Sequence, residues 1–268
     1  MLQKGYSHQV KESGRTRRLS PSNMLLATLL FLRQYPTHLF LAYVFHVSRP
    51  TISRTISFVM DCLYDFFRGT LVLPPRAIRD RESKILRGRR VSVVIDGTEQ
   101  RVCKSQFKDV EQAFYSGKKK SHTLTTLLAV SPTGFIYFLS GSYFGSLNDL
   151  NVAMLPENQV FKSLEPDEGI CADGGYKGMS RFHPNTFIPI VKTARQPELS
   201  PEETAFNNEL ASIRVVVENS IGHIKKWKCC YLPFRYDDIA DIHEIRKQHH
   251  RMWYVCASFT HLTVFPLR

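Results

Sequence analysis

The spacing of apolar residues changes near residue 90 and divides the chain into a helical part and a part that contains strands. Within 49–67, apolar residues recur every three or four positions, as in an amphipathic helix, at Ile52, Ile56, Val59, Leu63 and Phe66. Residues 91–95 instead form a continuous apolar run, which is typical of a strand buried on both faces. The pattern predicts an N-terminal all-α region followed by an α/β region.

Two shorter apolar segments precede the 49–67 helix, so the first 70 residues predict three helices. Ser20-Pro21-Ser22 starts the first, and Pro36-Thr37 ends it and opens the second. The third helix has a polar face made of Arg49, Thr51, Ser53, Arg54 and Ser57. This is the layout of a helix-turn-helix, whose third helix enters the major groove of DNA. A three-helix packing domain with a solvated arginine face is the alternative.

Strand and helix signals alternate after residue 90. Segments 123–130 and 134–139 flank Ser131-Pro132-Thr133 and predict a hairpin, and further strands are expected at 169–172 and 187–191. A short helix is expected at 147–154, and a long one starts at Ser200-Pro201-Glu202-Glu203, where a capping box meets proline at the first position. We predict a mixed α/β sheet with helical cover.

These patterns give an expected domain organisation. It consists of a basic flexible arm at 1–20, a helix-turn-helix domain at 21–70, a basic linker at 71–90, an α/β domain at 91–235 and a C-terminal helical extension packed on that domain at 236–268. The linker assignment depends on the prolines and arginines of 71–90.

Positive charge is concentrated in the helical third of the chain. Residues 1–90 hold 16 Lys and Arg against 5 Asp and Glu, which accounts for +11 of the net charge of +12. A cationic module of this kind most often faces a phosphate backbone or an anionic membrane surface. The apolar stretch 24–47 is interrupted by Arg33, Gln34 and Pro36, so it predicts two buried helices rather than a membrane span.

The six cysteines form no Cys-x-x-Cys pair, and they predict reduced core thiols in an intracellular protein without a signal peptide. A zinc site at the C-terminal end is disfavoured because the spacing there fits no familiar ligand pattern. The residues considered for it are Cys229, Cys230, His243, His249, His250 and Cys256.

Three acidic residues occupy positions that suit a metal-dependent nuclease. Asp96 is expected to end the strand 91–97, Asp173 the strand at 169–172, and Glu218 lies at the edge of the apolar stripe of the long helix. A carboxylate at the end of an apolar strand is costly unless positive charge compensates it. Two strand ends and one helical glutamate could converge on a pair of Mg²⁺ ions that cut or join phosphodiesters.

Each acid also has an ordinary structural interpretation. Asp-Gly at 96–97 and 173–174 is a common turn sequence, and Glu218 could pair with Arg214 on a solvated face. Glu99, Asp109 and Glu111 are rival acids near the first strand, and they rank lower because none ends an apolar run.

Several motifs give the chain a resemblance to a known family. They are Val-Ile-Asp-Gly-Thr-Glu at 94–99, Tyr-Ser-Gly-Lys-Lys-Lys-Ser-His-Thr at 115–123, Gly-Ser-Leu-Asn-Asp-Leu at 145–150, Ala-Asp-Gly-Gly-Tyr-Lys-Gly at 172–178 and the Arg-x-x-x-Glu…Gly-x-x-Lys helix at 214–225. In this order they resemble the Harbinger-type DDE transposases, a branch of the DDE-superfamily endonucleases. The N-terminal three-helix segment also resembles that family's.

The resemblance implies a ribonuclease H-like fold in 91–235, with Asp96, Asp173 and Glu218 as the catalytic, metal-binding triad. It implies two Mg²⁺ or Mn²⁺ ions when DNA is bound, strand cleavage by water and joining by the freed 3′-hydroxyl. Asp149 would have a supporting role. DNA contacts are expected from Lys118, Lys119, Lys120, His122, Arg214 and Lys225, and from Arg49, Thr51 and Arg54 of the helix-turn-helix.

Double-stranded DNA is the expected partner, with a homo-oligomer and an accessory DNA-binding protein as further possibilities. Nuclear residence is expected from the eukaryotic type of the resemblance and from basic runs such as Arg87-Gly88-Arg89-Arg90. A host-retained descendant that binds DNA or recruits a partner without catalysis is the alternative function. A phosphatase-like hydrolase would need an extra nucleophile or histidine cluster near Asp96, which the sequence lacks.

Overall fold

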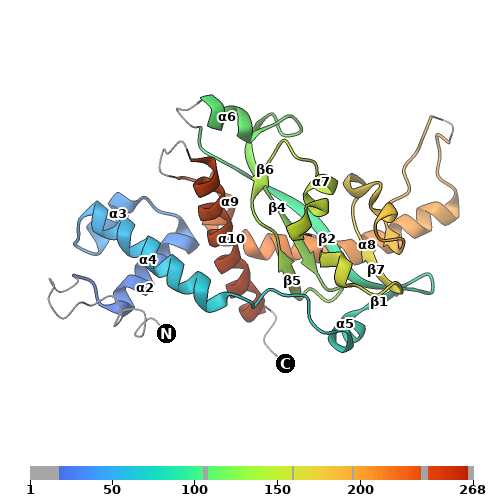
Figure 1. The fold of residues 1–268 in the computed structure, drawn as a ribbon, viewed down its shortest axis with the longest axis horizontal. Coiled ribbons are helices and arrows are strands. Elements are labelled where there is room, and N and C mark those ends of the chain that lie inside the picture. Colours follow the sequence, from blue (N-terminus) through green and yellow to red (C-terminus); the bar gives the residue numbers. More distant parts are fainter. Residues whose placement is uncertain (1–17, 105–107, 159, 195, 237–240, 265–268) are drawn as a thin grey trace.

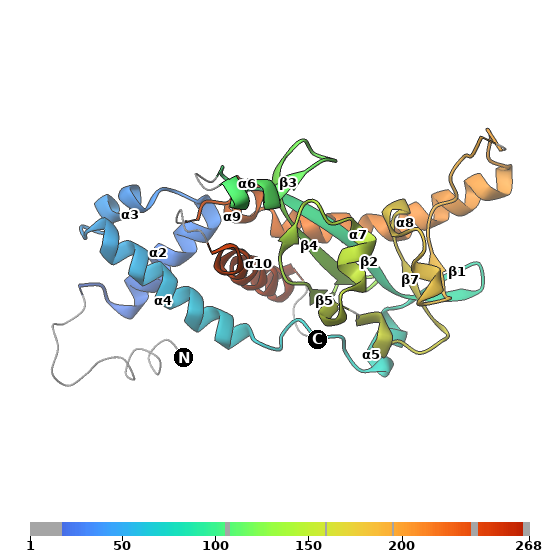
Figure 2. The same cartoon turned by 45° about the horizontal axis from the view of Figure 1, so that its top comes forward.

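The computed structural model describes residues 18–104, 108–158, 160–194, 196–236 and 241–264, so residues 1–17 of the predicted basic arm lie outside the described residues. The molecule is elongated, with a group of three helices at one end and the sheet and its covering helices at the other (Figure 1). The C-terminal helix lies between these two groups in both views (Figures 1 and 2).

The three N-terminal helices form as the sequence predicts. They are α2 (Pro21–Gln34), α3 (His38–Val44) and α4 (Arg49–Phe67). Each begins after a hydroxyl residue, Ser20, Thr37 or Ser48, whose side chain accepts a hydrogen bond from the backbone N–H three positions later. The buried side chains of Ile52 and Val59 lie on the core face of α4, in agreement with the apolar spacing.

The segment 71–90, which we predict as a linker, is folded into the sheet. It contains α5 (Arg76–Glu82) and β1 (Lys84–Leu86), and β1 pairs antiparallel with the next strand. Arg79 forms two hydrogen bonds of 2.7 and 2.6 Å with the buried carboxylate of Glu168. Arg87 pairs with Glu209 and Arg90 with Asp80. Arginines that suggest a linker by composition are therefore ion-pair partners, of Glu168 and Glu209 in distant elements and of Asp80 within the segment itself.

One mixed sheet forms the centre of the α/β region. Its main strands run in the order β4 (Ser121–Val130), β2 (Arg89–Arg101), β7 (Glu168–Cys171) and β8 (Thr186–Phe187). β4 is antiparallel to β2, whereas β7 and β8 follow in parallel. β3 (Tyr115–Ser116), β5 (Ile136–Leu139) and β6 (Tyr143–Phe144) pair with β4. The predicted mixed, ribonuclease H-like sheet is confirmed, although the last strand is much shorter than the predicted 187–191.

Helices cover the sheet on both faces. They are α6 (Lys108–Phe114), α7 (Asp149–Met154), α8 (Pro201–Ile224), α9 (Lys228–Tyr231) and α10 (Ile242–Val264), with single 3₁₀ turns at Pro156–Asn158, Val160–Ser163, Gly174–Tyr176 and Met179–Arg181. The predicted capping box of α8 is present at Ser200 and Glu203. Val94 belongs to the apolar cluster that includes α8, and Ile95 to the cluster that includes α7. Successive residues of β2 thus face opposite layers.

The helix α10 joins the helical module to the sheet. It packs against both α4 and α8, and its Trp253, Val255 and Cys256 are buried in a core that also contains Ile52 and Val59 of α4. Tyr254 donates a hydrogen bond to the backbone carbonyl of Phe67. Because the two parts share this core, removing the N-terminal helices would expose the apolar face of α10. Across the described ranges, every helix is too short or too polar to cross a membrane.

Candidate active site

Asp96 lies inside β2 and does not end it, contrary to the sequence-based expectation. The strand continues to Arg101 because its pairing with β4 runs from Val94 to Arg101. On the other side, pairing with β7 stops at Val94 and Cys171. Asp96 is therefore just past the point where the two parallel strands separate. Such a crevice at the carboxyl ends of parallel strands is where α/β proteins place their ligands.

Asp173 follows β7 after a single residue, Ala172, at the same crevice. Its side chain accepts a hydrogen bond of 2.6 Å from the backbone N–H of Gly175, which fixes the turn after the strand. The carboxylate of Asp149, at the start of α7, lies beside two glycines, Gly97 next to Asp96 and Gly175 near Asp173. A Cβ atom built at Gly97 would be 2.6 Å from Asp149 Oδ1, and one built at Gly175 would be 3.0 Å from Oδ2. Asp149 is thus in van der Waals contact with the backbone beside both Asp96 and Asp173.

Arg214 forms ion pairs with both Glu218 and Asp173 and so links the helix α8 to the acid that follows β7. It lies one turn before Glu218 on α8, and its Nη2 atom is 3.6 Å from Glu218 Oε1 and 3.8 Å from Asp173 Oδ2. The Arg214 side chain is only 17% exposed, whereas those of Asp173 and Glu218 are about half exposed. Arg214 thus holds these two carboxylates together, and its contact with DNA stays a prediction.

The environment of Asp96 disfavours its charged form. Burial, together with the negative charges of Asp173 and Asp149, raises the pKa of Asp96 to about 6. The hydrogen bond from the backbone N–H of Gly97 and the charge of Arg214 act in the opposite direction. A buried acid beside two others is stabilised when a cation binds between them.

The lysine block predicted to contact DNA forms the tip of a hairpin beside these acids. Lys118, Lys119 and Lys120 lie in the turn between β3 and β4, where Ser116 pairs with Ser121. The Nζ atom of Lys118 is 3.5 Å from Asp149 Oδ2, and the Asp149 charge raises the pKa of Lys118. The three lysine side chains are exposed at the edge of the acid cluster, where they can meet phosphate.

The remaining predicted contacts and the rival acids are tied to other groups. His122 Nε2 lies 3.5 Å from Glu111, and Lys225 is partly buried, so that burial lowers its pKa. Glu99 accepts a hydrogen bond of 2.7 Å from Thr123. The side chain of Asp109 lies outside the described residues. The structure thus gathers Asp96, Asp149, Asp173 and Glu218, and it leaves Glu99 and Glu111 with other partners.

Comparison with known proteins assigns the chain to a family. Residues 95–260 match the family described as DDE superfamily endonuclease, and residues 17–68 match the helix-turn-helix of DDE superfamily endonuclease. The chain belongs to the DDE superfamily endonuclease family. The first match contains all four clustered acids, and the second contains α2, α3 and α4.

A curated relative agrees with this assignment. Over 215 residues the chain is 24% identical to a probable transposase for insertion sequence element IS702 from Microchaete diplosiphon. The alignment covers 80% of this chain and 73% of the relative. No solved structure matches the chain. DDE superfamily endonucleases generally depend on a divalent metal, and their two domains imply DNA binding.

Two buried polar atoms in the cluster fit the presence of a bound metal ion with its waters. The hydroxyl of Tyr176 and the Nε atom of Arg214 are buried, and neither has a hydrogen-bond partner among the described residues. Tyr176 is fully buried and lies close to Asp149 and Asp96. Buried polar groups nearly always have a partner, so these two atoms are expected to meet water or a ligand held by the acids. The oxygen donors of the four acids suit Mg²⁺ or Mn²⁺.

Sequence reasoning missed Gly97 and Tyr176 as parts of the endonuclease site. Gly97 follows the first acid, and only a residue without Cβ lets Asp149 approach the strand there. Both residues lie within the motifs at 94–99 and 172–178, so the motifs contained the signal. The sequence could not show that a glycine and a tyrosine from distant segments both face Asp149.

Gly97→Ala is expected to lower the affinity for Mn²⁺ and the rate of DNA nicking by about 10- to 100-fold each, because the new methyl group pushes the Asp149 carboxylate away from the other acids. Calorimetric Mn²⁺ titration and a nicking assay measure the two effects. The control is Gly222→Ala in α8, where an added Cβ meets nothing within 4 Å. Equal Mn²⁺ affinity in both variants would show that the position of Asp149 is unimportant.

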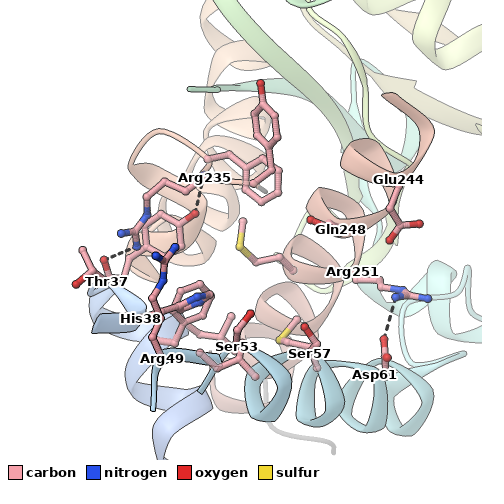
Figure 3. Close-up of a pocket in the computed structure, with 18 of the residues that line it drawn as sticks. Thr37, His38, Arg49, Ser53, Ser57, Asp61, Arg235, Glu244, Gln248 and Arg251 are labelled. Atoms are coloured by element: carbon pink, nitrogen blue, oxygen red, sulfur yellow. Dashed lines mark hydrogen bonds and ion pairs between the residues drawn. The ribbon is translucent and has the colours of Figure 1, made fainter. Parts of the chain in front are cut away.

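The helix-turn-helix presents its predicted DNA contacts on two different sides. Arg49 and Ser53 line a pocket of about 680 Å³ between α4 and α10, with Arg251 of α10 paired to Asp61 of α4 at 2.8 Å (Figure 3). Arg54 is exposed outside this pocket, and its Nε atom donates to the carbonyl of Pro50. Thr51 shares a hydrogen bond with the capping Ser48. The base or phosphate contacts of Arg49, Thr51 and Arg54 stay predictions.

Proposed function

We propose that this DDE superfamily endonuclease is an active transposase of the Harbinger type that cuts DNA at the ends of a mobile element and joins the freed strand to a new site. The observation that carries the proposal is the gathering of Asp96, Asp173 and Glu218 around Arg214, with Asp149 beside them. The motif order along the chain supports the Harbinger type, and the family membership supports action on DNA.

In this proposal, Asp96, Asp173 and Glu218 hold Mg²⁺ or Mn²⁺, with two ions present when DNA is bound. Bound metal would supply activation of the attacking oxygen and stabilisation of the leaving one. Arg214 keeps the half-exposed Asp173 and Glu218 within reach of one another before the metal binds. Lys118 pairs with the supporting Asp149 at 3.5 Å. With metal held beside Asp149, the exposed Lys118 ammonium would be available to pair with a DNA phosphate.

The nicking of supercoiled plasmid by the purified full chain tests this function. Mg²⁺ or Mn²⁺ should convert the plasmid to the nicked form, and a chelator should stop the reaction. Plasmid binding without any nicking in either metal would overturn the proposal and favour the alternative of a DNA-binding descendant without catalysis. A short duplex with a free 3′-hydroxyl then tests strand joining.

We further propose that DNA approaches α4 from the side of Arg54. The Arg49 side of α4 faces a pocket that α10 closes on its far side, where Arg251 pairs with Asp61 of α4 at 2.8 Å. This covered side leaves no open face for a duplex. Arg54 lies on the open side of the same helix, within the basic N-terminal third of the chain. In this arrangement Arg49 would contact the phosphate backbone of the DNA and would not read its bases.

Arg54→Ala is expected to weaken binding to preferred duplexes by about 1 to 3 kcal/mol and to reduce discrimination among sequences, because a base-reading arginine is lost. Preferred duplexes are first selected from a random library. Affinity measurements on enriched and scrambled duplexes then give the binding free energy and the discrimination among sequences. Arg49→Ala is the matched control and should weaken enriched and scrambled duplexes to the same degree. An equal loss on all sequences for Arg54→Ala would instead make Arg54 a phosphate contact.

A further inference from the structure

Three cysteines gather in the core where α9 meets α10. Cys229 and Cys230 belong to α9 and Cys256 to α10, and all three side chains are fully buried. The sulfur of Cys229 lies 3.8 Å from that of Cys230 and 3.5 Å from that of Cys256. All three sulfurs lie within 4.8 Å of one another. By contrast, Cys171 is buried in the sheet and does not belong to this cluster.

These separations match those of thiolates that share a metal ion. A Zn–S bond of about 2.3 Å in a tetrahedral site places the sulfur atoms about 3.8 Å apart. Three cysteines that only fill space as small apolar side chains have no reason to bring their sulfurs together in this way. Sequence spacing disfavoured a zinc site among the cysteines and histidines of this region, because Cys256 is far from Cys229 and Cys230 along the chain. The structure brings these three sulfurs together and leaves the histidines outside the cluster.

The surroundings of the cluster suit thiolate ligands. The backbone N–H groups of Cys229 and Cys230 point to the Cys229 sulfur, and the ammonium of Lys225 lies near Cys230. The amide of Gln100 in β2 donates hydrogen bonds of 2.7 Å to the carbonyl of Cys229 and 2.6 Å to that of Leu232. The Gln100 bonds hold the backbone that carries Cys229 in place, and the N–H groups directed at the sulfur offset the negative charge of a thiolate.

The nearby histidines have other partners. His249 bonds to Ser142 and to Gln100, and His250 bonds to the carbonyl of Ser140. His243 lies outside the cluster of possible ligands. Within the described part of the chain, the ligand set therefore consists of the three sulfurs.

We propose that Cys229, Cys230 and Cys256 bind one thiophilic d¹⁰ cation, Zn²⁺ or Cu⁺, as thiolates. Each thiol that coordinates the ion releases its proton to solvent. Soft sulfur ligands select such ions over Mg²⁺ and Mn²⁺, which prefer the oxygen ligands of the acid cluster. The site is therefore chemically separate from the proposed nuclease centre, and neither proposal depends on the other.

The location of the cluster gives the ion a structural role. The short helix α9 packs against both α2 of the helix-turn-helix and α10. An ion that ties α9 to α10 would hold the surface on which α2 sits. Binding to the folded chain alone stabilises that chain by mass action, so the metal-loaded protein should melt at a higher temperature than the metal-free one.

The test uses the full chain purified without chelator. Elemental analysis should find about one equivalent of zinc or copper, and the metal that is found distinguishes the two ions. After removal of the metal, Cd²⁺ titration should produce a sulfur-to-cadmium charge-transfer band in the ultraviolet that saturates at one equivalent. Cys229→Ala should weaken Cd²⁺ binding by about 100-fold or more, whereas Cys171→Ala should leave it unchanged.

Two results would overturn the proposal. The first is a wild-type chain that has no bound zinc or copper, gives no cadmium band and shows no change in melting temperature with Zn²⁺ or Cu⁺. The second is a disulfide between Cys229 and Cys256, which would appear in denaturant as the loss of two of the six free thiols in the wild type but not in Cys229→Ala. If Cys229→Ala fails to fold, the same measurements on Cys256→Ser decide between the outcomes.

Discussion

Asp173→Asn is expected to lower the rate of metal-dependent DNA nicking by about 1,000-fold or more while the fold remains intact. Asp173 is half exposed in the crevice beyond β7 and shares Arg214 with Glu218. An amide has almost the same shape but carries no charge, so it binds a divalent ion far more weakly. Losing about 4 kcal/mol of metal-derived stabilisation of the transition state corresponds to this factor.

An Asp→Asn substitution at Asp167, before the start of β7, provides the control. Asp167 lies just before β7, and its exposed carboxylate pairs with Arg76 through hydrogen bonds of 2.8 and 2.6 Å. Asp167→Asn removes an equal charge from the protein, but it should leave nicking within about twofold of wild type, because exposed ion pairs contribute little. Circular dichroism and melting temperature confirm folding. Wild-type nicking by Asp173→Asn would contradict the assignment of the metal ligands.

Arg79→Met is expected to destabilise the protein by about 3 to 5 kcal/mol, because it leaves Glu168 buried without its cation. The Glu168 side chain has no exposed surface, and that of Arg79 is 6% exposed. Arg79 also donates a hydrogen bond of 2.6 Å to the carbonyl of Pro74, so it holds the 71–90 segment against the start of β7. Urea unfolding at neutral pH measures the loss.

The neighbouring Arg76 gives a matched control. It pairs with exposed Asp167 and Asp80, so Arg76→Met should change the free energy of unfolding by less than about 1 kcal/mol. The double variant Arg79→Met/Glu168→Gln should recover part of the stability lost by Arg79→Met, since no buried charge remains. Equal losses for Arg76→Met and Arg79→Met would show that burial of the pair is unimportant.

The Arg79–Glu168 pair also has a defined pH dependence. Burial alone would raise the pKa of Glu168, but the hydrogen bonds from Arg79 hold it below its usual range. The Glu168 carboxyl therefore loses its proton at lower pH in the folded chain than in the unfolded chain. The contribution of the pair is fully present above the unfolded pKa of about 4.3 and disappears as the pH falls through the lowered folded value. Arg79→Met should lose this acid sensitivity.

Local sequence determined the secondary structure of several segments and the identity of the acids. Hydroxyl caps at Ser20, Thr37 and Ser48 and the capping box at Ser200 fix helix starts through contacts three residues away. The motifs around Asp96, Asp173 and Glu218 were sufficient to predict the family-level function. Their positions on two strands and a helix predicted that they would meet.

Tertiary structure alone decided where strands separate and which distant side chains become partners. The sequence predicted that Asp96 ends its strand, but β2 continues along β4 while its pairing with β7 stops, and this difference creates the crevice. The arginines of 71–90 suggested a linker because the sequence does not show that Arg79 meets Glu168, 89 residues later. Cys256 joins Cys229 and Cys230 only because α10 packs on α9. Local patterns report contacts within a turn or a strand, whereas these three outcomes depend on packing between segments far apart in the chain.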